Sequence, residues 1–193
     1  MKFVNGLLIG VICVICGPLR LGAETSAPRS GQAGISAQSA APQSAATTAR
    51  SETMHLTVVT SISDTTVATG KRLSLAFDIA PKKLMHVYAP GKHDYQVIAV
   101  KLDPQPWLKV QPTSYPPSEI YFFKELNEKT ETYSKPFKLV QDVTILATPE
   151  AQKLLAASPT VKVSGRLEYQ ACDDKVCYAP TKVPFSFALD VKE

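Results

Sequence analysis

The sequence predicts an all-β sandwich, and three patterns support this class. From Met54 onward, several short segments alternate large apolar side chains with small or polar ones, as in residues 72–79. Turn-forming residues separate these segments, and the 193 residues include fifteen prolines and nine glycines. One short stretch after Thr148 has the composition of a helix. Many short strands with frequent turn signals favour a sandwich over a sheet that is covered by helices.

The first 23 residues have the layout of a secretory signal peptide. A basic start at Lys2 precedes the apolar run 7–16, and Gly17 and Pro18 break that run before Ala23. The run is too short to span a bilayer as a helix. We therefore expect cleavage near Ala23 and a protein that is periplasmic or otherwise exported, with no stable membrane insertion after cleavage.

Residues 24–53 are predicted to form a disordered linker rich in Ala, Ser and Gln. Ile35 is the only large apolar side chain of this segment, which contains no aromatic residue. Such a composition buries too little apolar surface to offset the entropy lost on ordering the chain. The predicted domain therefore covers residues 54–193.

Within this domain, alternation predicts strands over residues 55–62, 72–79, 95–102, 138–147, 160–171 and 183–191. Turn residues at 69–71, 89–91 and 104–106 punctuate them. After the fourth of these strands, Thr148 suits a helix N-cap and Pro149 suits the first helical position. Residues 150–157 are good helix formers, so we expect a short connector helix there.

The charge balance excludes two classes of partner. The formal charge of +4 loses Lys2 and Arg20 with the signal peptide, which leaves 19 basic against 17 acidic residues, or +2. So small an imbalance gives no support to nucleic acid or to an anionic membrane as a partner.

Export reduces the number of cysteines from four to two. Cys13 and Cys16 lie in the apolar run and should leave with it. Each follows an isoleucine, whereas lipoprotein acylation needs small residues before the cysteine, so no lipoprotein is expected. Cys172 and Cys177 remain, in a compartment where disulfides can form and persist.

The spacing of Cys172 and Cys177 permits a hairpin disulfide but does not decide its role. Facing strands can bring two Cα atoms within the roughly 4.4 to 6.8 Å that a disulfide needs. A bridge across so short a loop contributes only about 2 kcal/mol in the chain-entropy model, which is a small gain for a structural staple. Asp173 and Asp174 disfavour a thiolate whereas Lys175 favours one, so an inert bridge and an exchanging bridge both remain open.

The three histidines add no chemistry that the sequence reveals. His55, His86 and His93 lack metal-ligand spacing with the cysteines and are remote from them in sequence. No Ser/His/Asp or Cys/His constellation at the spacing of a hydrolase motif is present. We therefore expect no metal and no cofactor.

The residues around the cysteines resemble a known family. Tyr-Gln-Ala-Cys at 169–172 and Cys-Tyr-Ala-Pro at 177–180 are similar to the cysteine hairpin of the amino-terminal periplasmic domain of the thiol:disulfide interchange protein DsbD. A looser similarity covers residues 54–193, through Glu-Thr-Tyr at 131–133 and a strand that carries Tyr88. The resemblance implies an immunoglobulin-like β-sandwich, here in a stand-alone form without the membrane conduit and thioredoxin-like domain of full-length members.

The resemblance also implies an activity and its partners. Cys177 would be attacked by the electron donor and would join mixed disulfides, and Cys172 would resolve them. Exchange is thiolate attack on sulfur and needs no cofactor. The chain would then be a component of a protein-disulfide reductase system, relaying electrons from a separate membrane donor to oxidised thioredoxin-fold proteins of the periplasm. The alternative is a secreted binding or chaperone-like sandwich whose disulfide is purely structural.

Family members cover the disulfide with an aromatic side chain on a cap loop. The matching position here is Leu126, and Phe122 or Phe123 could take its place. Residues 121–123 also suit a buried strand end, and Tyr88 also suits the core. The remaining candidates near the cysteines are Tyr88, Tyr178, Asp173 and Asp174.

Overall fold

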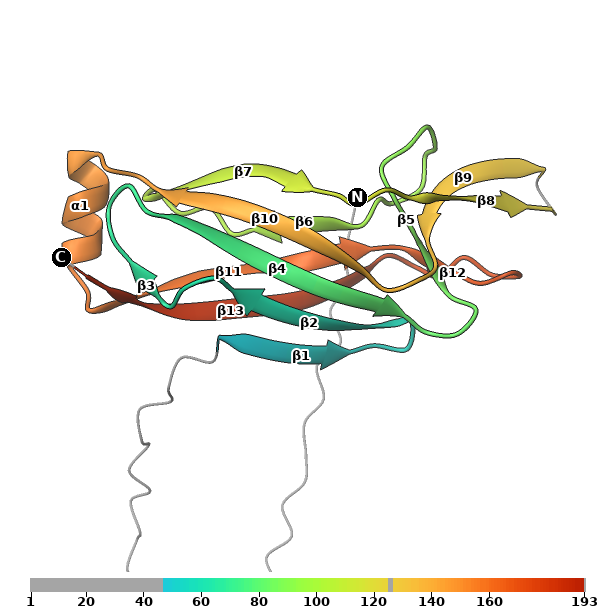
Figure 1. The fold of residues 1–193 in the computed structure, drawn as a ribbon, viewed down its shortest axis with the longest axis horizontal. Helices are drawn as coiled ribbons and strands as arrows, with labels where there is room; N and C mark the ends of the chain where they lie inside the picture. The colour runs from blue at the N-terminus through green and yellow to red at the C-terminus, as the bar shows by residue number, and fades with distance from the viewer. Residues whose placement is uncertain (1–46, 125–126, 193) are drawn as a thin grey trace, which may run out of the picture. The chain divides into compact units, whose positions relative to one another are not determined.

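Two facing β-sheets form an immunoglobulin-like sandwich, and a third, smaller sheet extends it at one end (Figure 1). The computed structural model describes residues 47–124 and 127–192. These residues form thirteen strands and one helix, so the predicted all-β class is confirmed. No helix within the described ranges is long and apolar enough to cross a membrane. The predicted signal peptide and most of the predicted linker lie outside the described residues.

The first sheet is antiparallel and supplies one wall of the core. Its strands follow the order β1 (Thr48–Glu52), β2 (Leu56–Ile62), β4 (Arg72–Pro81), β10 (Phe137–Ile145) and β7 (Leu108–Ser114). Strand β4 shows why it forms, since Leu73, Leu75, Phe77 and Ile79 are buried while the alternate positions face outward. Pro112 lies in β7 and lacks a backbone N–H. Because β7 is an edge strand, with a neighbouring strand on one side only, a proline is tolerated there.

The second sheet supplies the opposite wall. Its strands follow the order β3 (Thr66–Val67), β13 (Thr181–Val191), β11 (Thr160–Tyr169) and β6 (Ala99–Leu102). Strand β13 buries Val183, Phe185, Phe187 and Leu189 at alternate positions. The rings of Phe77 and Phe185 meet edge to face with centroids 4.9 Å apart, which joins the two walls across the core.

The third sheet lies at the end of the sandwich opposite the helix (Figure 1). It contains β12 (Ala171–Cys172), β5 (His86–Tyr88), β9 (Glu128–Tyr133) and β8 (Glu119–Phe123), in that order. Only Gln170 separates β12 from β11, so the chain passes directly from the second sheet into the third. The first cysteine of the pair is therefore carried on an extension of a core strand.

The connector helix α1 spans Pro149–Ala156, close to the prediction. Thr148 caps it, because its hydroxyl oxygen accepts a hydrogen bond from the N–H of Ala151 at 3.2 Å. Ala151 and Leu155 are the buried residues of its inner face. The helix packs at the far end of the sandwich and positions nothing at the cysteines.

The predicted linker was wrong at its carboxyl end. Residues 48–52 form β1, which pairs with β2 along its whole length, so the ordered domain begins before Met54. The side chains of β1 are small, polar or charged and mostly exposed. Backbone hydrogen bonds at the sheet edge hold this strand, and composition cannot reveal them. The predicted strand 95–102 is correct only for its second half, since β6 begins at Ala99.

Gly165 allows a close approach between strands in the second sheet. It lies in the middle of β11, opposite Leu102 of β6 and Phe185 of β13. A Cβ atom at this position would lie 2.3 Å from the Lys101 carbonyl oxygen and 3.0 Å from the Phe185 ring. The first of these neighbours is backbone, which cannot move aside as a flexible side chain can.

We expect Gly165→Ala to lower the free energy of unfolding by about 1–3 kcal/mol, because the added methyl group overpacks this contact. Guanidinium chloride unfolding followed by circular dichroism measures the change. Ser186→Ala, on the exposed face of neighbouring β13, is the control and should stay within about 0.5 kcal/mol of the wild type. Equal stability of Gly165→Ala and the wild type would contradict the close approach.

Candidate functional site

Cys172 and Cys177 form a disulfide across the base of a four-residue loop, with their Cα atoms 4.2 Å apart. Backbone hydrogen bonds flank the pair on both sides. The N–H of Tyr178 donates to the Ala171 carbonyl at 2.9 Å, and the N–H of Asp173 donates to the Val176 carbonyl at 3.0 Å. The cysteines are thus a non-hydrogen-bonded antiparallel pair, the arrangement in which opposed side chains lie closest.

The two cysteines differ in their access to solvent. Cys172 is fully buried, because β12 pairs with β5 and its sulfur faces the interior. Cys177 is exposed, on the return arm of the loop. A molecule that approaches from solvent therefore meets Cys177 first.

Asp173 shapes the loop between the cysteines. One of its carboxylate oxygens accepts hydrogen bonds from the N–H groups of Lys175 at 2.8 Å and Val176 at 2.7 Å. The hydroxyl of Tyr178 donates to the other oxygen at 2.9 Å. The bonds from the backbone of Lys175 and Val176, followed by the Tyr178 bond, hold the pKa of the Asp173 carboxyl below its usual range. The ionised Asp173 carboxylate therefore stabilises the turn by accepting the backbone N–H groups of the loop.

Tyr88 reaches both sulfur atoms. Its hydroxyl oxygen lies 3.0 Å from the Cys172 Sγ and 3.4 Å from the Cys177 Sγ. The residue is buried, and its ring stacks on Tyr95 with centroids 4.2 Å apart. Burial, with smaller effects of Tyr95 and of the Glu128 carboxylate, raises the pKa of the Tyr88 hydroxyl. The hydroxyl therefore keeps its proton and can donate to sulfur, which favours a thiolate over a thiol.

Tyr169 and Gln170 brace the arms of the hairpin. The Gln170 side-chain oxygen accepts from the Gln96 N–H at 3.2 Å, and its amide group donates to the Tyr178 carbonyl at 3.1 Å. The hydroxyls of Tyr169 and Thr53 share a hydrogen bond of 2.8 Å. These contacts tie both arms to neighbouring segments and explain why these residue types flank the cysteines.

The β8–β9 hairpin contacts the cysteine loop from the side. The Tyr121 hydroxyl donates to the Asp174 carboxylate at 2.6 Å, and the Tyr121 ring stacks on His86 at a centroid distance of 4.4 Å. Phe123 and Cys177 line the same small cavity. The hairpin therefore covers one flank of the disulfide.

The structure brings most of the predicted site residues together. Tyr88, Tyr178, Asp173 and Asp174 all contact the cysteines, their loop or the hairpin that covers it. Of the three cap candidates, Phe123 faces the cavity beside Cys177, Phe122 lies on the alternate face of β8 with 44% of its surface exposed, and Leu126 lies outside the described residues.

Sequence reasoning missed the histidines. His86 lies directly opposite Cys172 in the β5–β12 pairing, the His55 ring packs 4.6 Å from Tyr178, and the His93 ring packs 5.3 Å from Tyr88. Each is far from the cysteines along the chain, and only strand pairing and loop packing bring them near. The alternation in β5 places His86 and Tyr88 on one face of the strand, but three residues are too few to predict that strand from the sequence. Among the described residues, no group of three or more His, Cys, Asp or Glu side chains could hold a metal ion.

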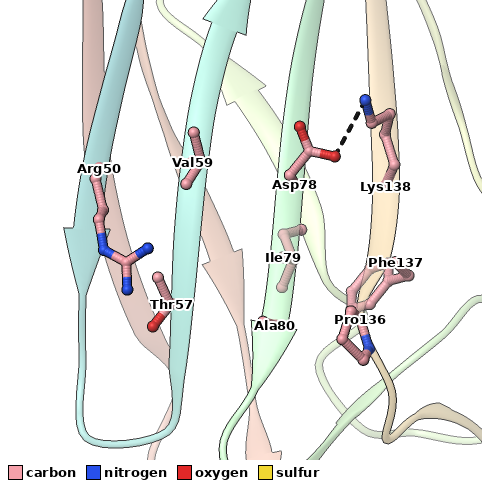
Figure 2. Close-up of a pocket in the computed structure, with 9 residues that line it drawn as sticks. All are labelled: Arg50, Thr57, Val59, Asp78, Ile79, Ala80, Pro136, Phe137 and Lys138. Carbon is pink, nitrogen blue, oxygen red and sulfur yellow. Dashed lines mark ion pairs between the residues drawn. The ribbon is translucent and has the colours of Figure 1, made fainter.

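A groove on the outer face of the first sheet is separate from this chemistry. Figure 2 shows side chains of β1, β2, β4 and β10 around it, and its volume is about 480 Å³. Its charged residues include Arg50 and the ion pair of Lys138 with Asp78, at 3.1 Å. No cysteine or histidine lines it. The groove therefore offers no redox group, and the disulfide remains the candidate site.

Comparison with known proteins gives a matching family and similar solved structures. A family model described as the N-terminal part of the thiol:disulfide interchange protein DsbD matches residues 54–188. The crystal structure of the N-terminal periplasmic domain of ScsB from Proteus mirabilis is similar, with 12% sequence identity and a TM-score of 0.44. That alignment covers 72% of this chain and 47% of the other, so this chain spans about half of its length. No curated protein sequence matches.

Tyr88→Phe tests the hydroxyl that lies between the sulfurs. In the reduced protein, we expect the variant to raise the apparent pKa of the more reactive thiol by about one unit, since a hydrogen bond to a charged group is lost. The pH dependence of alkylation by iodoacetamide, followed by mass spectrometry, measures this pKa. Tyr115→Phe is the matched control, because the Tyr115 hydroxyl donates to the Ile98 carbonyl instead. An unchanged pKa in Tyr88→Phe would show that the hydroxyl does not act on sulfur.

Proposed function

The chain belongs to the family of DsbD amino-terminal domains, and from this membership and the geometry of its cysteine pair we propose that it is a thiol–disulfide exchange module of the periplasm. Its dithiol form reduces disulfides in thioredoxin-fold proteins, and a separate membrane donor regenerates it. It acts as a component of a protein-disulfide reductase system. Residues 1–23 direct export and leave the mature chain, and residues 24–47 link that leader to the domain.

The difference in exposure between the two cysteines carries the proposal. A donor thiolate attacks the Sγ of exposed Cys177, the disulfide breaks, and buried Cys172 leaves as a thiolate beside the Tyr88 hydroxyl. A second donor thiol then attacks the mixed disulfide and releases Cys177. In the outgoing reaction, the Cys177 thiolate attacks a partner disulfide and Cys172 resolves the adduct.

We assign the cover of the site to the β8–β9 hairpin. Phe123 is the aromatic candidate, since it lines the cavity beside Cys177, and Tyr121 fastens the hairpin to the loop through Asp174. A partner that docks on Cys177 has to displace or slide past this hairpin. The hydrogen bond of Tyr121 to Asp174 is exposed, so its loss on docking costs little.

A second candidate is a binding or chaperone-like sandwich with a structural disulfide. The tight capping of the loop by Asp173 and the complete burial of Cys172 favour it, since both restrict the pair to one geometry. Two measurements separate the candidates.

The first measurement is the reduction potential of the disulfide, determined by equilibration with dithiothreitol or glutathione buffers and intact mass analysis. We expect a value above about −250 mV, in the range of exchanging disulfides. A value below about −300 mV identifies a structural bridge and overturns the proposed exchange.

The second measurement is trapping of mixed disulfides. Cys172→Ala leaves Cys177 without its resolving thiol, so we expect stable adducts with oxidised thioredoxin-fold proteins on non-reducing gels. Cys177→Ala is the matched control and should form few adducts, because the remaining thiol is buried. Equal adduct formation by both variants would contradict the assigned roles, and its absence from both would contradict exchange itself.

A further inference from the structure

His86 is a buried histidine beside the disulfide that the exchange steps above do not use. It pairs with Cys172 across β5 and β12, and directly opposed residues of an antiparallel pair place their side chains on the same face. Only 2% of its surface is exposed, and its Nε2 has no hydrogen-bond partner among the described atoms. A buried polar atom without a partner is costly and calls for an explanation.

A small cavity connects His86 with the exposed cysteine. His86 and Cys177 both line it, together with Tyr88, Thr130 and Glu128. Its volume of about 10 Å³ is close to what one water molecule needs. The wall offers imidazole, hydroxyl and carboxylate groups, which are the polar partners that a buried water requires. A single water in this cavity would have the Cys177 side chain and the imidazole among its neighbours.

The surroundings of His86 decide its charge. Burial lowers the pKa of the imidazole, and the carboxylates of Asp174 and Asp173 partly oppose this effect. The other titratable groups that face its side of the third sheet are Tyr88 on its own strand, Tyr121 on β8, Glu128 on β9 and Tyr95 on the loop between β5 and β6. The lowered pKa keeps the ring neutral at neutral pH in the disulfide form, and one of the two nitrogens of a neutral imidazole can accept a proton. A thiolate formed nearby favours the protonated ring.

We propose that His86 is the proton acceptor of the exchange reaction and takes the proton of the Cys177 thiol through a water molecule in this cavity. The inference rests on the proposed function. Transfer leaves a Cys177 thiolate and an imidazolium, and the thiolate attacks the disulfide of the partner protein. The first partner sulfur departs with the proton from His86. The Cys172 thiol then gives up its proton, its thiolate attacks the Cys177 Sγ, and the second partner sulfur departs and takes up that proton, which restores the intramolecular disulfide.

Glu128 is the rival base in the same cavity. Its carboxylate already accepts a hydrogen bond of 2.8 Å from the Tyr95 hydroxyl. The His86 Nε2, by contrast, has no hydrogen-bond partner among the described atoms. Of these two groups, the imidazole is therefore the one with a nitrogen that no other described group engages.

Alkylation of Cys177 tests the proposal in the Cys172→Ala background, where it is the remaining thiol of the exported chain. The rate of reaction with iodoacetamide is followed by mass spectrometry between pH 4 and pH 9. With His86 present, we expect thiolate reactivity to rise with the titration of the imidazole, well below the range of an ordinary thiol. His86→Tyr keeps a ring that can stack on Tyr121 but removes the base. It should lower the rate at pH 7 about tenfold and move the profile to that of an ordinary thiol.

A second readout needs no substitution at His86. NMR titration of the His86 ring in the otherwise wild-type protein should give a higher pKa in the dithiol form than in the disulfide form, because a nearby thiolate stabilises the imidazolium. Equal values in the two forms, or a His86→Tyr profile identical to that with His86, overturn the proposal. So does Glu128→Gln if it produces the loss expected for His86→Tyr.

Mixed-disulfide trapping in the same Cys172→Ala background separates this inference from the function on which it rests. Normal adducts with an unchanged alkylation profile in His86→Tyr overturn the role of His86 and leave exchange standing. If the alkylation profile depends on His86 but no mixed disulfide forms with any partner, the proposed exchange is overturned. The role of His86 in exchange then falls with it.

Discussion

The passage of the chain between two sheets at Gln170 is the constraint on which the site depends. Up to Tyr169, the chain pairs with β13 inside the sandwich, and from Ala171 it pairs with β5 in the third sheet. Gln170 secures the transition by bonding the backbone on both sides. The core therefore determines where β12, which carries Cys172, leaves the sandwich, and the third sheet determines which side chains surround that cysteine. Within the third sheet, the pairing of β12 with β5 then places the buried sulfur of Cys172 against Tyr88 and His86.

The immediate environment of the disulfide is built mainly from rings. Tyr88 lies between the sulfurs and Tyr95, while His86 lies between Tyr88 and Tyr121. Such rings have few rotatable bonds, so they hold their polar edges in place at a low cost in entropy. The acidic side chains sit at the margin, where Asp173 caps the loop and Asp174 receives the Tyr121 hydroxyl. The disulfide is therefore bordered by closely packed aromatic rings, and the carboxylates of Asp173 and Asp174 lie at the margin of the site.

The long strands could be predicted from the sequence, because burial of one face leaves a period of two in the side chains, as in β4. The cap at Thr148 could be predicted from residue type, and the cysteine pair from the loss of the other two cysteines with the predicted signal peptide. Strand β1 could not be predicted, since edge hydrogen bonds involve only the backbone. The short strands β5 and β8 hold three and five residues, too few for a periodic pattern. The place of His86 could not be predicted either, because the β5–β12 pairing joins segments 86 residues apart, and nothing in the sequence specifies that register.

The hydrogen bonds that flank the cysteines do not involve sulfur. The bonds of Tyr178 to Ala171 and of Asp173 to Val176, together with the pairing of β12 with β5, remain available when the S–S bond is broken. With these backbone hydrogen bonds intact, the two thiols would stay opposite each other. Attack of Cys172 on a mixed disulfide at Cys177 would then be an intramolecular reaction with a high effective molarity. A thiol of another molecule would have to attack the mixed disulfide faster than Cys172 does. In the proposed exchange, this backbone register would therefore keep the lifetime of a mixed disulfide at Cys177 short.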